Sequence, residues 1–584
     1  MMRRNIYSVI LSVSVLLGVC AVSSGQNLDP TVEVSRSYEG KLMEVHKPAI
    51  RMDVPDSVLR FDLEFDYSVS DSPYKGAYEF SPYAMEMRPA SKYYDFRKFY
   101  LKAGAGYSLH PELDVIWSPS FRKPFRLDVY ASNRSYVGNY WNIVRKEESD
   151  GTYSIGRQMN NGDESRHWKS FDLASKAGVA GRYDWEKARL GFDVGYRGIH
   201  QGKGVMTSGR SYNALEAEAY VGSKDRKDSS FGYHVSAVYH LGGDRLAFED
   251  IEGTSVKTQD LDVDARMRFG FSNGDRLVLE AGFRAASTTG YLASGGGEFD
   301  VVPHYMMDRG RWRFDIGARI SPVFRNLVDG GVYSYEEQML YPDVRIEFMA
   351  LRDALKLYID LGGDSRMASY DDLLANDRRA DFMYGRGVWN ILDIEDESLS
   401  ASLGADGRIG AHFGYDLKAG YSIMANALTD GLTVIDGILA PAVGYAAYDK
   451  AFAAASWLLD ADSFRFDGNI RYTYAVFRNA ESASGLFLPA ALTGDLAMKY
   501  NWKKRLDVGL DCVFSTARKG SVKDVAADAS IPGYADLGLS AEFSLNRKFS
   551  FWARGGNLLG MTIQRSLLYA EKGPYFTAGI CLNL

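Results

Sequence analysis

The sequence predicts an all-β protein, a transmembrane antiparallel β-barrel of about 22 strands with no covalent plug domain. Two observations support this prediction. Segments with strict apolar alternation recur along most of the chain, and the connections between them are alternately short and long. A third observation argues against a bundle of membrane helices. No long apolar run of the kind that a transmembrane helix requires follows the first 25 residues.

The alternating segments begin near residue 97, and each is roughly 9 to 15 residues long, which is the length that a tilted strand needs to cross a bilayer. Successive side chains of a strand point to opposite faces of the sheet. In "RWRFDIGARI" one face is therefore apolar, with Trp312, Phe314, Ile316, Ala318 and Ile320. Apolar rows of this length predict a face toward lipid.

Charged residues occupy the other face of the same segments. In a closed barrel this face forms the inner wall, where charges can pair across strands and stay hydrated. A structural role is the default expectation, and a permeation path or a docking surface are the alternatives. The expected lumen-wall charges are Asp260, Asp262, Asp264, Arg266, Arg268, Arg311, Arg313, Asp315, Arg319, Arg465, Asp467 and Arg471.

The last ten residues, "YFTAGICLNL", read as the strand that closes the barrel. Their apolar row, expected to face lipid, is Phe576, Ala578, Ile580, Leu582 and Leu584. The two cysteines after the leader lie on opposite parities, Cys512 with the apolar row and Cys581 against it. Side chains on opposite faces of a wall cannot meet the geometry of a disulfide, so both are expected to be free thiols.

The connections indicate how the barrel is oriented. Short turns such as "FSNGDR" alternate with long polar connections, and the first connection, "LHPEL", is the only break in the pattern. Outer-membrane barrels have short periplasmic turns and long extracellular loops. Both termini are therefore expected in the periplasm, and the connection 363–396, with Asn376 near its centre, at the cell surface. The long connections are 134–168, 200–212, 241–256, 322–340, 363–396, 425–446, 516–533 and 556–573.

The segments before the barrel have other compositions. Residues 1–25 read as a secretory signal peptide, with Arg3 and Arg4 before an apolar stretch and small residues before Gln26. Residues 26–96 contain six prolines and predict a periplasmic or lumen-entering arm, and residues 97–584 form the barrel. The formal net charge of −7 argues against a nucleic-acid partner.

Two stretches carry a resemblance to a known family. "WNILDIEDESLSASLGADGRIGAHFGYDLKAGY" resembles the barrel of TonB-dependent receptors. "FSFWARGGNLLGMTIQRSLLYAEKGPYFTAGICLNL" is similar to their last two strands, with Asn557-Leu558-Leu559 in the place of an Asn-Leu-Phe-like signature. The resemblance covers about residues 97–584 and implies an outer-membrane barrel. Those receptors carry a plug for which residues 26–96 are too few, so the chain resembles the plug-less barrels found beside such receptors in Bacteroidota.

Catalytic and metal motifs are weak. "GFSNG" (270–274) matches the nucleophile-elbow pattern, but a second alternating segment follows where that motif needs a helix. The eight histidines form no pair with metal-ligand spacing, although His234 and His240 share a parity with Asp244 nearby. No cofactor, metal site or catalytic residue is predicted.

Two functions remain open at this point. The first is a porin-like or partner-gated passage of solutes across the outer membrane. The second is a structural or assembly subunit of an outer-membrane complex with a blocked lumen. A barrel enzyme of the phospholipase or protease type is a more distant alternative. The expected partners are outer-membrane lipid and other envelope proteins, through residues 26–96 or the long loops. Something should occlude so wide a bore: the 363–396 connection, the arm or another protein.

Overall fold

A computed structural model describes most of residues 98–584. The gaps are 108, 122–123, 148–151, 158–165, 205–207, 225–229, 248–253, 291–292, 327–331, 335–339, 380–391, 436–437, 480–483 and 524. The predicted signal peptide (1–25) and arm (26–96) lie outside the described residues, so their boundaries remain predictions.

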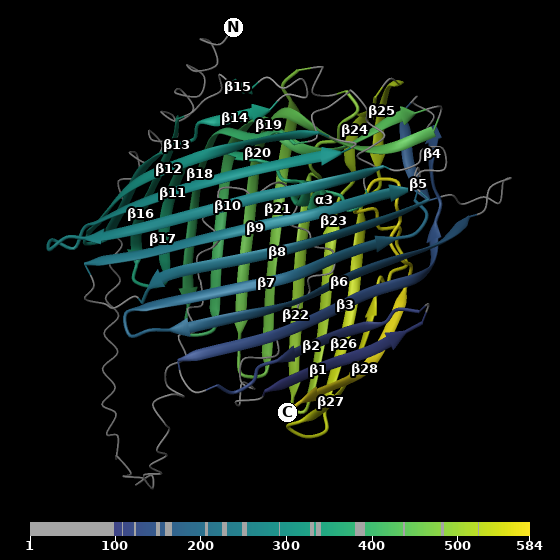
Figure 1. The fold of residues 1–584 in the computed structure, drawn as a ribbon, viewed down its shortest axis with the longest axis horizontal. Helices are drawn as coiled ribbons and strands as arrows, with labels where there is room; N and C mark the ends of the chain where they lie inside the picture. The colour runs from purple at the N-terminus through teal and green to yellow at the C-terminus, as the bar shows by residue number, and fades with distance from the viewer. Residues whose placement is uncertain are drawn as a thin grey trace, which may run out of the picture. The chain divides into compact units, whose positions relative to one another are not determined.

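Twenty-two antiparallel strands form a closed ring, as predicted (Figure 1). The ring closes where β28 pairs with β1, with Ala103 opposite Ile580. Each strand pairs with the next one in the ring, so no edge with unpaired backbone groups is left, as a membrane requires. The first eleven ring strands are β1 (Phe99–Gly106), β2 (Glu112–Trp117), β3 (Phe125–Trp141), β6 (His167–Asp184), β7 (Ala188–Gln201), β8 (Gly209–Ser223), β9 (Phe231–Ala247), β10 (Ser255–Gly270), β11 (Arg276–Gly290), β12 (Ser294–Arg309) and β13 (Trp312–Ile320).

The ring continues from β13 through β16 and returns to β1. Two short strands, β14 (Val323–Asn326) and β15 (Val332–Ser334), extend the sheet beside β12. The remaining ring strands are β16 (Leu340–Leu351), β17 (Leu355–Met367), β18 (Ile394–Ile409), β19 (Phe413–Ile435), β20 (Ile438–Asp460), β21 (Phe464–Phe477), β22 (Leu492–Trp502), β23 (Leu506–Ser515), β26 (Tyr534–Ser544), β27 (Phe549–Gly556) and β28 (Tyr575–Asn583).

The exposed apolar side chains follow the predicted alternation. On β13, Trp312, Ile316 and Ile320 are exposed, and on β21 Tyr472 and Tyr474 are exposed. Similar rows run along most strands of the ring, among them Leu190, Phe192, Val194 and Tyr196 of β7. Continuous apolar rows on the outside of a closed barrel form a surface suited to lipid.

The connections differ at the two ends of the barrel, but less regularly than predicted. The hairpin at Asn273-Gly274 is tight, and the φ of +89° at Gly274 is a conformation that favours glycine. Two features depart from the predicted alternation of short and long connections. The β11–β12 connection, from Gly290 to Ser294, is also short. Residues 425–446, expected to be a polar connection, instead mostly extend β19 and β20, because their alternating apolar residues pair as far as Ile435 and Ile438.

The long connections form a second, smaller structure, called the cap from here on. Its four-stranded sheet has the order β24 (Arg518–Val522), β25 (Val525–Ile531), β5 (Tyr153–Arg157) and β4 (Ile143–Glu147). Segments 485–488 and 563–570 complete the cap. They bring Phe487, Leu567 and Leu568 into one buried cluster with Ile155 of β5 and Leu432 of β19. This cluster gives the connections a hydrophobic core that they share with the extended end of β19.

The described residues contain one short helix, α3 (Tyr370–Asn376), in the connection between β17 and β18. Ser369 caps its N-terminus, since its hydroxyl accepts from the Asp372 backbone N–H and the Asp372 carboxylate accepts from the Ser369 backbone N–H. Two helical turns are too few to be stable alone, so the helix depends on the surfaces that it touches. No helix in the described part of the chain is long and apolar enough to cross a membrane.

Candidate functional site inside the barrel

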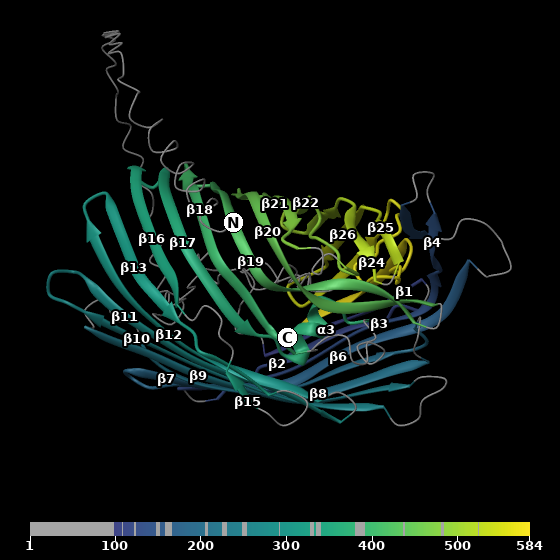
Figure 2. The ribbon, with the colours of Figure 1, turned by 90° about the horizontal axis from the view of Figure 1, so that it is seen from above.

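Residues 368–379, called the inner segment from here on, run through the inside of the ring. α3 lies on the concave side of the strands (Figure 2). The inner segment contacts Asp172 of β6 at one point and Asp430 of β19 at another. Asn376 and Arg378 are only two residues apart, so the two carboxylates lie close together although β6 and β19 are far apart in the ring order. Asp430 belongs to the extension of β19 beyond residue 425, which meets segment 485–488 and Arg518 of the long connections. The inner segment therefore lies inside the ring along the wall from β6 to β11, and the β19 extension reaches it there.

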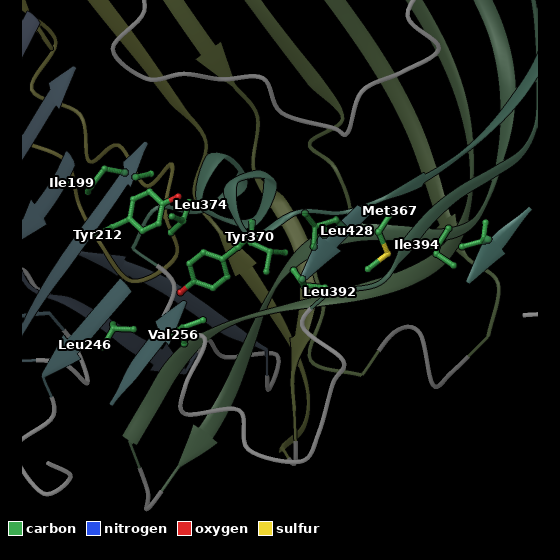
Figure 3. Close-up of a cluster of buried hydrophobic side chains, with 14 residues drawn as sticks. Ile199, Tyr212, Leu246, Val256, Met367, Tyr370, Leu374, Leu392, Ile394 and Leu428 are labelled. Atoms are coloured by element: carbon green, nitrogen blue, oxygen red, sulfur yellow. The ribbon is translucent and has the colours of Figure 1, made fainter. Parts of the chain in front are cut away.

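Apolar side chains of the inner segment fix its position against the wall (Figure 3). Tyr370, Leu373 and Leu374 of α3 are buried among strand residues such as Tyr212 and Leu428. The cluster also includes Met367 and Leu392, which lie just before and after the turn-back of the chain. Burial of these side chains supplies the packing that a two-turn helix lacks by itself.

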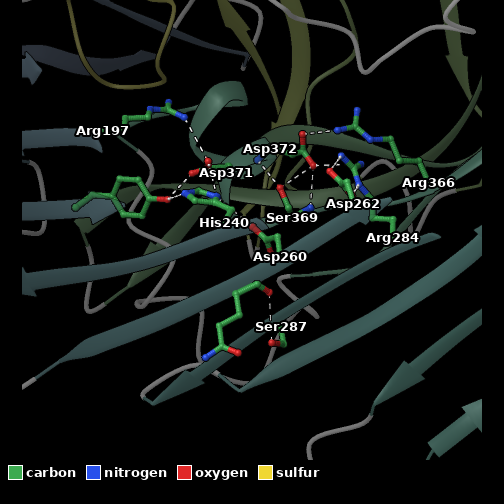
Figure 4. Close-up of polar contacts among 12 residues, drawn as sticks. Arg197, His240, Asp260, Asp262, Arg284, Ser287, Arg366, Ser369, Asp371 and Asp372 are labelled. Carbon is green, nitrogen blue, oxygen red and sulfur yellow. Dashed lines mark hydrogen bonds and ion pairs between the residues drawn. The ribbon is translucent and has the colours of Figure 1, made fainter. Parts of the chain in front are cut away.

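Ion pairs hold the first turn of α3 to the wall (Figure 4). Asp371 contacts Nδ1 of His240 at 2.8 Å and Arg197 at 3.4 Å, and it accepts a hydrogen bond from the Tyr212 hydroxyl at 2.5 Å. Burial works against the charged form, but the His240 hydrogen bond and the Arg197 charge hold the pKa of Asp371 below its usual range. Asp371 is therefore a charged anchor.

Asp372 is a second anchor on the same helical turn. It lies 2.6 Å from Arg366 and 3.7 Å from Arg284, which also pairs with Asp262 of β10 at 2.6 Å. Burial again opposes ionisation, but Arg366, Arg284 and the Ser369 backbone N–H lower the pKa of Asp372. Carboxylates in the first turn also interact favourably with the helix dipole.

A more deeply buried pair lies under Tyr370. Arg210 of β8 donates to Asp244 of β9 from Nε at 2.9 Å and from Nη2 at 2.5 Å. The Tyr370 hydroxyl donates to the same carboxylate at 2.7 Å, and Arg210 also donates to the backbone carbonyl of Arg378 at 3.0 Å. One wall pair thus binds both ends of the inner segment.

The C-terminal end of the inner segment meets the extension of β19. Asn376 donates to Asp430 of β19 at 2.7 Å, and Arg518 of the cap pairs with the same carboxylate at 2.6 Å. Asp377 follows, buried, with its carboxylate accepting from the Arg379 backbone N–H at 2.9 Å. Burial, assisted by the charge of Asp430, raises the pKa of Asp377 to about 7. Asp377 is therefore a group of the inner segment that titrates near neutral pH.

A narrow cleft, called the arginine cleft from here on, opens beside the end of the inner segment. It lies between Arg378 and Arg379, the β3 and β6 wall, and the β27–β28 connection. Arg379 donates to Asp172 and to the Tyr140 hydroxyl, both at 3.2 Å, while Arg378 also pairs with Asp172. The lining residues are Tyr136, Tyr140, Asp172, Arg378, Arg379, Arg565, Ser566, Tyr569, Ala570, Glu571 and Lys572.

The predicted lumen-wall charges are placed on paired strands, with one exception in a turn. Asp260 contacts His240, Asp262 contacts Arg284, and Arg319 contacts Asp364 and Asp300. Asp260 and Asp262 thereby join the network around the inner segment. Arg311 lies in the hairpin turn between β12 and β13, not in a strand.

The other predicted charges lie away from the inner segment. Arg266 pairs with Glu280, Arg313 approaches Asp308, and Asp315 lies 3.1 Å from Nδ1 of His304. Arg465 pairs with Asp467, and the Arg471 guanidinium lies over the Phe452 ring. Asp264 and Arg268 lie on β10 with the charged parity of that strand. Among the described contacts, Asp260 and Asp262 therefore join the network around the inner segment, and most of the other predicted lumen-wall charges do not.

The closing strand has the predicted alternation. Phe576, Ala578, Ile580 and Leu584 are exposed, and Leu582 is half-buried. On the other parity, Thr577 and Cys581 are buried. Both described cysteines are free thiols, as predicted.

Several residues of the site were not predicted from the sequence. Asp371, Asp372, Asn376 and the arginine pair 378–379 belong to a connection that was expected at the cell surface, and that expectation was wrong for residues 368–379. The missed signal was local: a serine followed three residues later by an acid, ahead of two leucines, is a helix start. Of the unassigned histidines, His240 proved to be part of the network.

The described residues do not form the catalytic sites that the sequence motifs could suggest. The "GFSNG" stretch is a strand–turn–strand hairpin and lacks the helix of a nucleophile elbow. The Ser211 hydroxyl lies 3.0 Å from Nδ1 of His200, but the described contacts of His200 include no carboxylate that would orient its ring. Likewise, the described chain brings together no group of three side chains able to hold a metal ion.

Comparisons with known proteins show which solved structures share this fold. No protein-family model and no curated protein matches the sequence. Solved structures do match. The ferric enterobactin receptor of Pseudomonas aeruginosa has a TM-score of 0.59 and 11% identity, covering 83% of this chain and 80% of that one. The FrpB iron transporter of Neisseria meningitidis has 0.61 and 10%, covering 84% and 82%. A copper transporter, OprC, has 0.56 and 10%, covering 83% and 80%. The predicted resemblance to the barrel of TonB-dependent receptors is confirmed for the fold.

Proposed function

We propose that this protein is an outer-membrane barrel for gated passage of solutes, and that the inner segment is its gate. The observation that carries the proposal is that residues 368–379 are fastened inside the ring, to Asp172 of β6, to Asp244 of β9 and to Asp430 in the extension of β19. A segment held inside the ring, together with the strand extension that reaches it, narrows the interior. The structural neighbours are receptors and transporters by name, and they support a passage function in general terms.

The way in which the inner segment is held supports a gate more than a permanent seal. Besides the buried apolar side chains of α3, ion pairs and hydrogen bonds hold it through Asp371, Asp372, Asn376 and Arg379. Water and ions compete for polar contacts, so such contacts can exchange as the segment moves. Barrels of about 22 strands are wide enough to hold a plug, and here a piece of the wall's own connection occupies that place.

The apolar outer surface of the barrel supports a location in the outer membrane. The exposed apolar rows on the barrel fit a bilayer, and the predicted arrangement places the long connections and the cap outside the cell and both termini in the periplasm. Residues 26–96 and the long connections are the surfaces through which an envelope partner would act on the gate. No described residue identifies that partner.

Planar-bilayer recordings of the purified full-length protein test the proposal. The wild-type protein is expected to conduct rarely or not at all. Replacement of residues 369–379 by a glycine-serine linker of equal length should give large, long-lived steps. A matched control replaces the exposed turn 503–505 with glycine and serine and should behave as the wild type. Large open steps from the wild-type protein would instead indicate a permanently open porin.

The second candidate is a structural subunit with a blocked lumen. The cap favours it, because Phe487, Leu567 and Leu568 pack in a hydrophobic cluster that stabilises the connections without the inner segment. The same recordings separate the two. If the linker variant is folded, as judged by heat-modifiable mobility, and still silent, then the cap or the arm blocks the bore and the structural role is favoured. Deletion of residues 26–96 in the same background tells the arm from the cap.

A further inference from the structure

The arginine cleft has the composition of an anion site. Four of its lining side chains are basic (Arg378, Arg379, Arg565 and Lys572) and two are acidic (Asp172 and Glu571). Asp172 serves two guanidinium groups at once, while Arg565 pairs with Glu571 and with Asp536. The Nε of Arg565 is buried and has no hydrogen-bond partner among the described residues, so a strong donor in the cleft is left for a ligand.

The orientation of Arg379 is fixed before any ligand arrives. Its guanidinium lies 4.8 Å from the Tyr140 ring centroid and 5.1 Å from that of Tyr569. Its N–H groups also donate to Asp172 and to the Tyr140 hydroxyl, so ring contacts and hydrogen bonds together restrict its orientation. A guanidinium held in this way loses little conformational freedom on binding, which favours affinity.

The basic residues come from two different segments. Arg378 and Arg379 end the inner segment, and Arg565 and Lys572 belong to the β27–β28 connection. Cations from separate segments that share one cleft repel each other, and a bound anion reverses that repulsion. An anion between them would therefore tie the inner segment to the β27–β28 connection.

We propose that the arginine cleft binds a small oxyanion between Arg379, Arg565 and Lys572, and that the bound anion locks the inner segment in place. The shared chemistry is a sulfate, phosphate or carboxylate group, either free or carried on a sugar acid. The second part rests on the proposed gate. A ligand that binds the closed arrangement alone shifts the population toward it, so the anion reduces opening.

Lys572 gives the site a pH signature. It is buried, its Nζ lies 2.9 Å from Nε2 of His110 and 3.8 Å from the Tyr575 ring centroid, and burial lowers its pKa to about 7. The groups that face it are His110, Glu112 on β2, Tyr136 on β3, Asp172 on β6, Arg554 on β27, and Glu571 and Tyr575 beside it. Burial and the neighbouring cations lower the pKa of His110 to about 3, so His110 stays neutral near pH 7. An anion favours protonated Lys572, so binding should strengthen as pH falls through about 7.

Calorimetric titration of the detergent-purified full-length protein with sulfate tests the binding, because sulfate does not titrate near neutral pH. Sulfate should bind more tightly at pH 6 than at pH 8.5, and chloride should not replace it. Arg379→Gln and Lys572→Met should each weaken sulfate binding by about tenfold or more, since each removes a charge-assisted hydrogen bond. Arg345→Gln is the matched control, because Arg345 pairs with Glu347 on the wall away from the cleft. Glucuronate against glucose distinguishes an anion carried on a sugar from a free one.

The outcomes separate the two parts of the proposal. Absence of sulfate binding, or equal weakening by Arg345→Gln, would overturn the anion site and leave the gate untouched, since the gate is tested by the linker variant. If sulfate binds, bilayer recordings on Asp371→Asn, whose gate is loosened, should show fewer openings with sulfate present. That reduction should be lost in Asp371→Asn/Arg379→Gln. Openings that sulfate leaves unchanged would overturn the locking role.

Discussion

Two charge pairs from the same sequence pattern have different environments in this barrel. Arg210 and Asp244 lie under the inner segment with side chains 2% and 0% exposed, and their closest atoms are 2.5 Å apart. Arg465 and Asp467 lie on β21 with side chains 51% and 37% exposed and a 3.0 Å separation. Both pairs belong to the charged parity of their strands. The alternation of charges places residues on a face, but the long connections decide which of them become buried fasteners.

The largest effect is expected at the buried pair. Asp244→Ala leaves Arg210 buried without its carboxylate and removes the acceptor of the Tyr370 hydroxyl. Breaking a buried pair by removal of one partner costs about 3–5 kcal/mol. Limited trypsin digestion should show faster cleavage after Arg378 and Arg379 as the inner segment is released. Unchanged cleavage, compared with Asp467→Ala as the control, would show that the pair does not hold the segment.

A change on the outer face of the strands should have the next largest effect. Ile316 is exposed on the apolar row of β13, and Ile316→Arg should destabilise the inserted barrel by about 2–4 kcal/mol if the residue lies near the bilayer midplane. The measurement is the denaturant midpoint in liposomes, read by heat-modifiable mobility on gels. Equal effects of Ile316→Arg and Asp467→Asn would mean that the two faces are wrongly assigned.

The pH dependence of the gate should be smaller. The pKa of Asp377 is raised above its unfolded value of 3.8 to about 7, so the folded state favours the protonated carboxyl. Stability from this group is therefore complete below pH 3.8 and is lost progressively as pH rises toward 7. Trypsin cleavage of the inner segment should increase from pH 5 to pH 7 in sulfate-free buffer. Asp377→Asn should flatten that dependence, and an unchanged slope would contradict the assignment.

The smallest effect is expected at the hydrated pair. Asp467→Asn should change stability by about 0–1 kcal/mol, because an exposed pair exchanges its contact for water. The denaturant midpoint in liposomes checks this value. A loss of stability as large as that of Asp244→Ala would show that buried and hydrated charge pairs do not differ in their contribution to stability.

Most of the barrel could be predicted from the sequence, because each strand can be recognised from the alternation of a few neighbouring residues. Alternation along "RWRFDIGARI" or "YFTAGICLNL" is visible within ten residues, and each such strand pairs with its neighbour. The extension of β19 and β20 was missed, since Asn, Asp and Gly among residues 425–446 suggested a loop, whereas alternating Leu428, Leu432 and Val434 accompany continued pairing.

The inner segment could not be predicted in the same way. Its partners, among them Asp172, Asp244 and Asp430, lie far from it in the sequence, and no short pattern connects a carboxylate on β6 with an arginine after α3. The charged face was predicted as an inner wall with structural pairing as the default. The closure of the ring determines which of these charges come near the inner segment.

The central claim is that residues 368–379 close the interior, and a reversible tether tests it most directly. Asn376 and Asp430 lie in hydrogen-bond contact, so Asn376→Cys/Asp430→Cys, combined with Cys512→Ser, Cys581→Ser and Asp371→Asn, places two thiols within reach of a short cross-linker that forms a disulfide with each of them and tethers the segment to β19. Single-channel recordings are made before and after addition of reductant. The account predicts silence when the tether is oxidised and large open steps after reduction. Equal conductance in both states would show that the inner segment does not control the bore.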